Sequence, residues 1–452
     1  MNLLRVGYAS VNVNPPLGIG VTGYYVPRYA KGFLNDLTAA ALVLACGDTR
    51  IALVALDMEG WTTPLANECA EVIEKATGIS KNNVFLSCTH THTGPCFTPP
   101  TSFEADPEPI LQYVEFLKQR SADAVSLAQK DLRSARMGYI VGQAPDRIAY
   151  IRRYRMKDGS VMTCPPVGDP NIDHPLGTLD QRVNVLRFDR EGAQTVVLVN
   201  YGLHADTTNG EMISADFPHW LRLTVEKALD GVQCMFFNGA EGDVGSTHVH
   251  PEGGDMNDTE ISFDNEMKSP GMARFVGRAL AGTVLQVYDK VCYTDVESID
   301  IRRRSFVVAA NVPDPKDLPL AHQYKEYHES GRDDLIPYTA MELTTVVAEA
   351  LRMCKYENGP YEFPIEITGL RIGNVAMVGI PGEPFTEVGV KIKEAPGWDA
   401  ILPCALTNGG EGYFPVRSAY DEGGYETRTS RYKAGVAETV IENAKQLLNE
   451  LK

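Results

Sequence analysis

Five short apolar segments constrain the fold of this chain more than any other feature. Each is flanked by a loop that carries glycine or proline together with His, Asp, Glu or Tyr; the segments are residues 84–86, 195–199, 234–237, 375–380 and 401–406. Short apolar runs between turn signals are typical of buried strands. Polar side chains collected at the ends of such strands are how α/β enzymes build their sites.

Segments with helical spacing alternate with these strands. They cover residues 65–77, 110–132, 216–229, 272–290, much of 318–356, and 432–451. We expect Gly78 to end the first helix and Asp216 to cap the third. Residues 39–45 and 51–56 are separated by Gly-Asp-Thr and predict a hairpin. Because no linker and no short-period repeat is visible, we predict a single large α/β domain over residues 1–452, with a mixed β-sheet and surrounding helices.

Charge and cysteine content narrow the class of protein. The 452 residues carry a formal net charge of −17, which argues against binding to nucleic acid or to anionic membranes. The start of the chain has no signal-peptide pattern, and no apolar run reaches the roughly 18–20 residues of a membrane span. The nine cysteines are scattered without a Cys-x-x-Cys pair, which indicates reduced thiols. We therefore expect a cytoplasmic protein that acts on a small molecule, with a homo-oligomer as one option.

The segment Thr89-His90-Thr91-His92 is the strongest chemical signal in the chain. In an extended segment, residues i and i+2 point to the same side. His90 and His92 can therefore face one pocket, where imidazole binds metals such as zinc or moves protons. The alternative is a pair of surface histidines in a threonine-rich loop.

Further metal donors follow the later strands. His204 and Glu383 each stand in a loop after an apolar run. Two histidines, one glutamate and one further oxygen donor would complete a four-coordinate zinc site. Taken alone, His204 is equally well explained as a core histidine at a strand end, and Glu383 as an ordinary turn carboxylate.

The order of these motifs resembles that of the neutral, non-lysosomal ceramidases. The segment from Thr89 to Pro95 matches their Thr-His-Thr-His-Ser-Gly-Pro motif, and the likeness continues through His204, Gly-Asp-Val at 242–244, Pro-Gly-Glu at 381–383, and Gly-Tyr at 412–413. The resemblance implies that zinc is held by His90, His204, Glu383 and Tyr413, and that His92 faces the substrate carbonyl. Tyr420 and Tyr425 are alternatives to Tyr413 because they lie nearby in the sequence.

This chain also departs from the pattern of that family. Gly-Asp-Val-Gly at 242–245 replaces Gly-Asn/Asp-x-Ser-Pro, so the family's serine is replaced by Gly245 or shifted to Ser246. The family's additional C-terminal immunoglobulin-like domain and its export signal are also missing from the sequence. We therefore expect the fold and the metal chemistry to carry over, and ceramide as substrate not to.

These observations predict a zinc-dependent hydrolase that cleaves an amide, or an ester or lactone, of a small polar substrate. A zinc-bound water would attack the carbonyl, and His92 would stabilise the oxyanion. Asp243 or His248 would move protons, and Arg153 would bind a substrate carboxylate or carbonyl. The alternatives are a zinc-dependent lyase or isomerase that acts on a sugar acid, and a metal-binding protein without catalysis.

Overall fold

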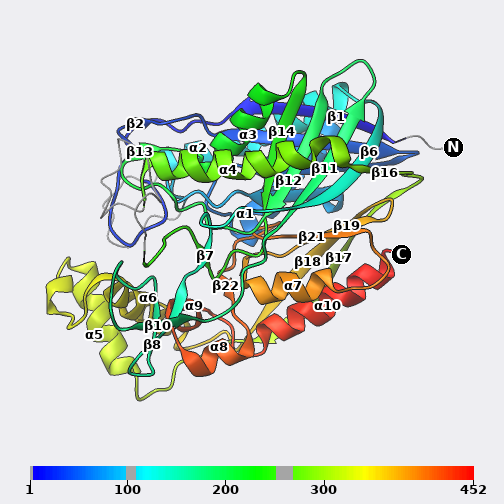
Figure 1. Ribbon diagram of the computed structural model, residues 1–452. Helices are drawn as coiled ribbons and strands as arrows, with labels where there is room; N and C mark the ends of the chain where they lie inside the picture. Colours follow the sequence, from blue (N-terminus) through cyan, green and yellow to red (C-terminus); the bar gives the residue numbers. More distant parts are fainter. Residues whose placement is uncertain (1–3, 98–107, 251–267) are drawn as a thin grey trace.

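The computed structural model describes residues 4–97, 108–250 and 268–452. Two β-sheets pack face to face, and helices cover the outer face of each sheet (Figure 1). The larger, nine-stranded sheet has the order β14 (Val232–Asn238), β12 (Thr195–Tyr201), β11 (Arg182–Arg190), β6 (Arg133–Gln143), β1 (Arg5–Asn12), β3 (Thr38–Cys46), β4 (Thr49–Leu56) and β5 (Val84–Cys88), with β16 (Cys292–Thr294) beside β6. The smaller has the order β17 (Ile299–Ala309), β18 (Glu362–Ile372), β19 (Val375–Gly379) and β21 (Ala400–Cys404). The predicted mixed α/β fold with surrounding helices is confirmed.

One topology occurs three times along the chain. In each unit, three antiparallel strands are followed by a crossover helix and by a fourth strand that pairs parallel with the third. The units are β1-β3-β4-α1-β5, β6-β11-β12-α3-β14 and β17-β18-β19-α7-β21, with crossover helices α1 (Thr63–Thr77), α3 (Asp216–Ala228) and α7 (Thr386–Lys393). Parallel strands end at the same edge of a sheet, so each unit sends two neighbouring loops to one side.

Side chains alternate between the two faces of each strand, and this alternation builds the layers. In β3, Leu42 and Leu44 pack between the sheets with Leu370 of β18, whereas Ala41 and Val43 face α1 and α2 (Glu108–Lys130). Helices α3 and α4 (Pro270–Val287) cover the second unit, and α7 and α10 (Val436–Glu450) cover the third. In Figure 1, α7 and α10 lie below the strands of the smaller sheet.

The larger sheet curves until its two edges meet. Strands β14 and β5 stand at opposite ends of the strand order, yet they contact each other. The ring of Phe85 on β5 packs edge-on against Phe237 on β14, with the ring centroids 6.1 Å apart. This curvature brings the loops that follow β5, β12 and β14 to one place.

Two predictions made from local sequence signals are confirmed, and a third is wrong. Strands β3 and β4 form the predicted hairpin, and Gly78 ends α1 in the left-handed conformation with φ of 73°. Asp216 does not cap α3: Ala215 occupies the cap position, and Asp216 has φ of 55°. Its buried carboxylate accepts the N–H groups of Thr207 and Thr208, both at 3.0 Å. The loop after His204 is buried and needs those acceptors, so tertiary contacts override the local preference.

The remaining elements are short connections or form a helical pair at the lower left of Figure 1, α5 (Leu318–Glu329) and α6 (Ala340–Tyr356). The short strands are β2 (Gly32–Phe33), β7 (Tyr150–Ile151), β8 (Arg153–Met156), β9 (Val161–Thr163), β10 (Ile172–Pro175), β13 (Met212–Ile213), β15 (Val244–Gly245), β20 (Glu383–Pro384) and β22 (Tyr413–Phe414). The short helices are α8 (Arg417–Glu422), α9 (Tyr425–Thr429) and the 3-10 turns Lys81–Asn83, Tyr288–Lys290 and Asp333–Leu335. In the described ranges, no helix combines the length and apolarity needed to cross a bilayer.

Candidate metal centre

Three imidazole rings from two units of the fold converge at the loop edge of the sheets. His90 and His92 follow β5, and His204 follows β12. Each offers a ring nitrogen within 4.8 Å of those of the other two. The Nε2 atoms of His90 and His92 are 3.3 Å apart. His90 has a left-handed backbone with φ of 70°, so the two rings meet at a bend and not along the extended segment that the sequence predicted.

Backbone carbonyls fix the tautomer of all three rings. The Nδ1 atoms of His90, His92 and His204 donate to the carbonyl oxygens of Glu59 (2.8 Å), Gly23 (3.2 Å) and Glu241 (2.8 Å). In a neutral ring this leaves the Nε2 lone pair free to face the centre of the cluster. Metal-binding histidines have this arrangement, because the second nitrogen is held by a backbone or carboxylate acceptor.

The carboxylate of Glu383 closes the cluster from the third unit. Its Oε2 lies 3.2 Å from His90 Nε2 and 3.1 Å from His204 Nε2. Burial alone would lower the pKa of His90, but the carboxylates of Glu383, Glu241 and Glu59 outweigh it and raise that pKa to about 9. Burial, together with the charge of Arg152, lowers the pKa of His204 to about 4. The carboxylates therefore favour positive charge at the centre of the cluster.

The unpartnered atoms of the cluster fit a divalent metal. His204 Nε2 and Glu383 Oε2 are both buried without a hydrogen bond, and such atoms are costly unless something pairs with them. In a tetrahedral zinc site with bonds of about 2.0–2.1 Å, neighbouring ligand atoms lie about 3.3 Å apart. The distances from Glu383 Oε2 to the Nε2 atoms of His90 and His204 match this spacing.

Tyr413 lies beside His204, with the two rings stacked at a centroid distance of 6.4 Å. Its hydroxyl accepts a hydrogen bond from Arg152 at 3.0 Å. Tyr420 instead donates to the carbonyl oxygen of Tyr432 at 2.7 Å. The hydroxyl of Tyr425 lies 3.4 Å from that of Tyr25. Of the three tyrosines considered from the sequence, Tyr413 is the one that stacks on His204.

Neither of the predicted proton-transfer residues belongs to the group formed by the three rings. The Asp243 carboxylate accepts the N–H and the hydroxyl of Thr386, at 2.7 and 2.8 Å, at the start of α7. His248 stacks on Tyr150 with ring centroids 4.7 Å apart. A buried carboxylate at a helix N-terminus is accounted for by capping, so Asp243 has a structural explanation here.

Arg152, and not its neighbour Arg153, reaches the cluster. The guanidinium of Arg153 is buried and donates to the carbonyl oxygen of Gly423 (2.8 Å) and to Glu422 (3.1 Å). Arg152 donates to Glu426 (2.7 Å) as well as to Tyr413. Adjacent strand residues point to opposite faces, so a pair of arginines in a sequence does not reveal which of them faces a site.

A cavity beside His204 has charged and polar side chains in its walls. Its walls include Arg152, Asp206, Ser246, Thr247 and Lys268. Lys268 donates to Asp206, which also accepts a 2.6 Å hydrogen bond from Tyr24 and lies 3.9 Å from His92 Nδ1. Among the described parts of the chain, the buried Ser246 hydroxyl finds no hydrogen-bond partner. Lys268 and Glu241 were missed in the sequence, because neither stands in a motif, although Glu241 lies in one of the five strand-end loops.

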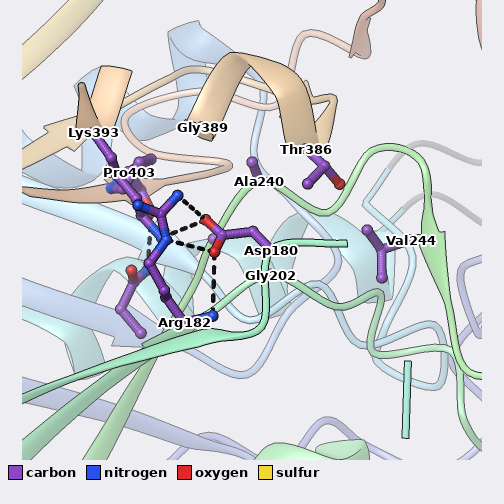
Figure 2. A pocket seen from close by; sticks show the side chains of 11 residues that line it. Asp180, Arg182, Gly202, Ala240, Val244, Thr386, Gly389, Lys393 and Pro403 are labelled. Carbon is purple, nitrogen blue, oxygen red and sulfur yellow. Dashed lines mark hydrogen bonds and ion pairs between the residues drawn. The ribbon is translucent and has the colours of Figure 1, made fainter. Parts of the chain in front are cut away.

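A second, smaller cavity lies behind the loops that carry His204 and Glu241 (Figure 2). Gly202, Ala240 and Thr386 line it, together with the charged group in which Asp180 accepts hydrogen bonds from Arg182 and Lys393 at 2.7 and 2.8 Å. None of the three clustered histidines lines this cavity. It therefore belongs to the support of the loops and not to the metal centre.

The loop that carries Gly242 is in close backbone contact with the loop that carries Glu383, and a substitution of the glycine tests this contact. A Cβ atom on Gly242 would lie 2.6 Å from the backbone oxygen of Glu383, whereas one on Gly245 would meet only the Arg152 side chain at 3.6 Å. We expect Gly242→Ala to lower the free energy of unfolding by about 1–3 kcal/mol, as overpacking does. Gly245→Ala, the matched control, should stay within about 0.5 kcal/mol. Denaturant titration of both variants measures this, and equal stabilities would contradict the close contact.

Comparisons with known proteins support the fold. No protein-family model matches the chain, and no curated protein matches it in sequence. The solved structure of the neutral ceramidase from Pseudomonas aeruginosa superposes with a TM-score of 0.72 over 100% of this chain and 75% of that one, at 18% sequence identity. A ceramidase complexed with C2 gives 0.72 over 100% and 76%, at 17% identity. The chain therefore has a ceramidase-like fold.

Proposed function

We propose that this protein is a zinc-dependent hydrolase that cleaves an amide bond, or an ester or lactone, of a small polar substrate. The observation that carries the proposal is the convergence of the His90 and His204 Nε2 atoms with the Glu383 carboxylate at the spacing of zinc ligands. The structural likeness to ceramidases, whose name denotes cleavage of an amide, supports the reaction type.

His90, His204 and Glu383 would hold the metal, with Tyr413 as the fourth donor. Bound zinc would supply a water whose pKa is lowered toward about 7 and would polarise the substrate carbonyl. Burial raises the pKa of Tyr413 well above its usual value, and Arg152, which donates to the Tyr413 hydroxyl, opposes this rise and favours the phenolate form that a metal binds. It also ties this tyrosine to Glu426, which fixes the position of the side chain.

His92 is proposed to accept a proton at Nε2. From the sequence we expected it to donate a hydrogen bond to the oxyanion. However, its Nδ1 hydrogen is directed at the carbonyl oxygen of Gly23, and burial lowers its pKa well below the usual value despite the nearby Asp206. A neutral ring held in this way has a lone pair at Nε2. It can therefore take a proton from the attacking water and later return it to the leaving group.

The cavity beside His204 supports a polar substrate. Arg152, Asp206 and Lys268 bring charged atoms to its walls, and Ser246 offers a buried hydroxyl without a partner. A long alkyl chain in this cavity would leave the Ser246 hydroxyl buried without a partner, which is unfavourable. A hydroxyl, amine or carboxylate group of an N-acyl amino acid or amino sugar would pair with that hydroxyl and could bind beside the charged pairs.

Metal analysis and a substrate panel test the proposal. We expect about one zinc per chain, loss of hydrolysis after chelation, and recovery when Zn²⁺ is added back. Among N-acyl amino acids, N-acyl amino sugars, esters, lactones and long-chain ceramide in detergent, the small polar compounds should be turned over and ceramide little or not at all. Glu383→Ala serves as the control for background activity.

Two results would count against this function. Absence of any transition metal from several fresh preparations would contradict the metal centre. Rapid turnover of ceramide that Glu383→Ala abolishes would contradict the polar substrate, while leaving the metal-dependent chemistry in place.

A further inference from the structure

The threefold topology places six strand-end loops around the metal centre, two from each unit. The last residue pairs between third and fourth strands are Leu56 with Cys88, Tyr201 with Asn238, and Gly379 with Cys404. These pairs provide a common reference for comparing the positions of side chains in the three units.

Glu241 holds the place in the second unit that His90 holds in the first. His90 comes two residues after the end of β5, and Glu241 three residues after the end of β14. In the loops after the third strands, Glu59 comes three residues after Leu56, and His204 comes three residues after Tyr201. Leu56 and Tyr201 are the last residues of their strands that pair with the fourth strand. The loop that follows the fourth strand of each of the first two units therefore carries a metal-ligating type of side chain at nearly the same position.

The carboxyl group of Glu241 is buried and has no partner. Glu241 is 0% exposed, and neither Oε1 nor Oε2 makes a hydrogen bond to any residue that the structure describes. Its backbone oxygen accepts the Nδ1 hydrogen of His204 at 2.8 Å, and the N–H of the next residue, Gly242, donates to Pro384 at 2.9 Å. The residue is thus held between the loop of His204 and the loop of Glu383.

A carboxylate in such a position calls for a cation. Burial raises the pKa of the Glu241 carboxyl group well above its usual value, so the group is charged in this dry site only when a metal or another cation compensates it. The backbone contacts of Glu241 with His204 and of Gly242 with Pro384 place this residue beside two of the proposed ligands, His204 and Glu383. Glu59, the other extra carboxylate, accepts a hydrogen bond from the Thr22 hydroxyl and is partly satisfied in this way.

We propose that Glu241 is a further ligand of the metal centre and supplies a carboxylate oxygen beside His90, His204 and Glu383. This inference rests on the metal site of the proposed function. A second carboxylate makes the donor set richer in hard oxygen ligands, which extends the metals that it accepts from Zn²⁺ toward Mn²⁺.

Glu241→Gln tests the assignment through metal affinity. Purified, metal-depleted protein is titrated with Zn²⁺ and with Mn²⁺ in competition with a chromophoric chelator. Even partners outside the ligand shell change metal affinity by about 10–100-fold when mutated, so we expect Glu241→Gln to weaken binding by at least about tenfold, and more for Mn²⁺ than for Zn²⁺. The visible absorption spectrum of the Co²⁺-loaded protein should change with the loss of the carboxylate ligand.

Matched variants keep the test interpretable. Glu226→Gln changes a carboxylate on α3 that accepts the Cys234 N–H at 2.9 Å. This substitution should leave the metal affinity unchanged. Because Glu241 has no partner to lose, metal-depleted Glu241→Gln should unfold at a temperature no lower than metal-depleted wild type. Glu241→Met, with an apolar side chain of similar length, should show the same loss of affinity if glutamine is not tolerated.

The outcomes separate this inference from the proposed function. Wild-type affinity and an unchanged Co²⁺ spectrum in Glu241→Gln would overturn the assignment of Glu241 while the metal centre stands. Failure of the wild-type protein to bind any divalent metal would overturn the proposed function itself.

Discussion

Replacing His90 with alanine should remove the metal and the activity together, whereas His92→Ala should keep the metal and lose turnover by about 10²–10⁴, the contribution of a positioned general base. The two rings are neighbours, with their Nε2 atoms 3.3 Å apart. Only His90 also lies 3.2 Å from Glu383 Oε2, at the spacing of two ligands of one ion. The two histidines are therefore expected to differ in function despite their shared loop.

Metal content and turnover, measured on the same preparations, distinguish the two roles. His204→Ala is the positive control for metal loss, because its Nε2 lies 3.1 Å from Glu383 Oε2. His248→Ala is the control for removal of a histidine that stacks on Tyr150 instead of joining the cluster, and it should retain the metal. If His92→Ala lost the metal to the same degree as His90→Ala, His92 would be a ligand and its proposed role in proton transfer would be wrong.

The sequence predicted the layers of the fold because they depend on local periodicity. The runs at 84–86, 195–199, 234–237, 375–380 and 401–406 all became buried strands. The threefold recurrence of topology was not visible. Its units share the order of strands and helices, but the loops between matching strands differ in length, and the pairing partners are far apart in the chain. A pattern of pairing leaves no periodic signal in the sequence when only burial, and not residue identity, is shared.

The site was predictable where a side chain follows a strand end closely, and not where the loop conformation decides its direction. His90, His92, His204 and Glu383 lie within a few residues of a strand, and the structure brings them together. Arg152 and Arg153 are neighbours in the sequence, but Arg152 donates to the Tyr413 hydroxyl, whereas Arg153 donates to the backbone oxygen of Gly423. Glu241 has no motif to mark it. Its buried, unpartnered carboxyl group becomes evident only in three dimensions.

A buried ion pair joins the first unit to the second and gives the largest expected effect on stability. Asp57 follows β4, is 0% exposed, and accepts hydrogen bonds from both terminal nitrogens of Arg222 on α3, at 2.8 and 2.7 Å. It also accepts the N–H and the hydroxyl of Thr38, at 2.9 and 2.7 Å. Two residues further on, the backbone oxygen of Glu59 holds His90. This pair therefore supports both the packing of the units and the position of His90.

We expect Asp57→Ala to lower the free energy of unfolding by about 3–5 kcal/mol, because it leaves the Arg222 guanidinium buried without its carboxylate. The matched control is Asp300→Ala, which breaks an Arg302 pair at 2.9 Å whose side chains are 48% and 32% exposed. Water replaces that contact, so the control should lose less than about 1 kcal/mol. Urea titration of metal-depleted protein measures both variants without a contribution from metal binding. A loss below 1 kcal/mol for Asp57→Ala would mean that Arg222 finds another acceptor or reaches solvent, and that this ion pair contributes little to holding the two units together.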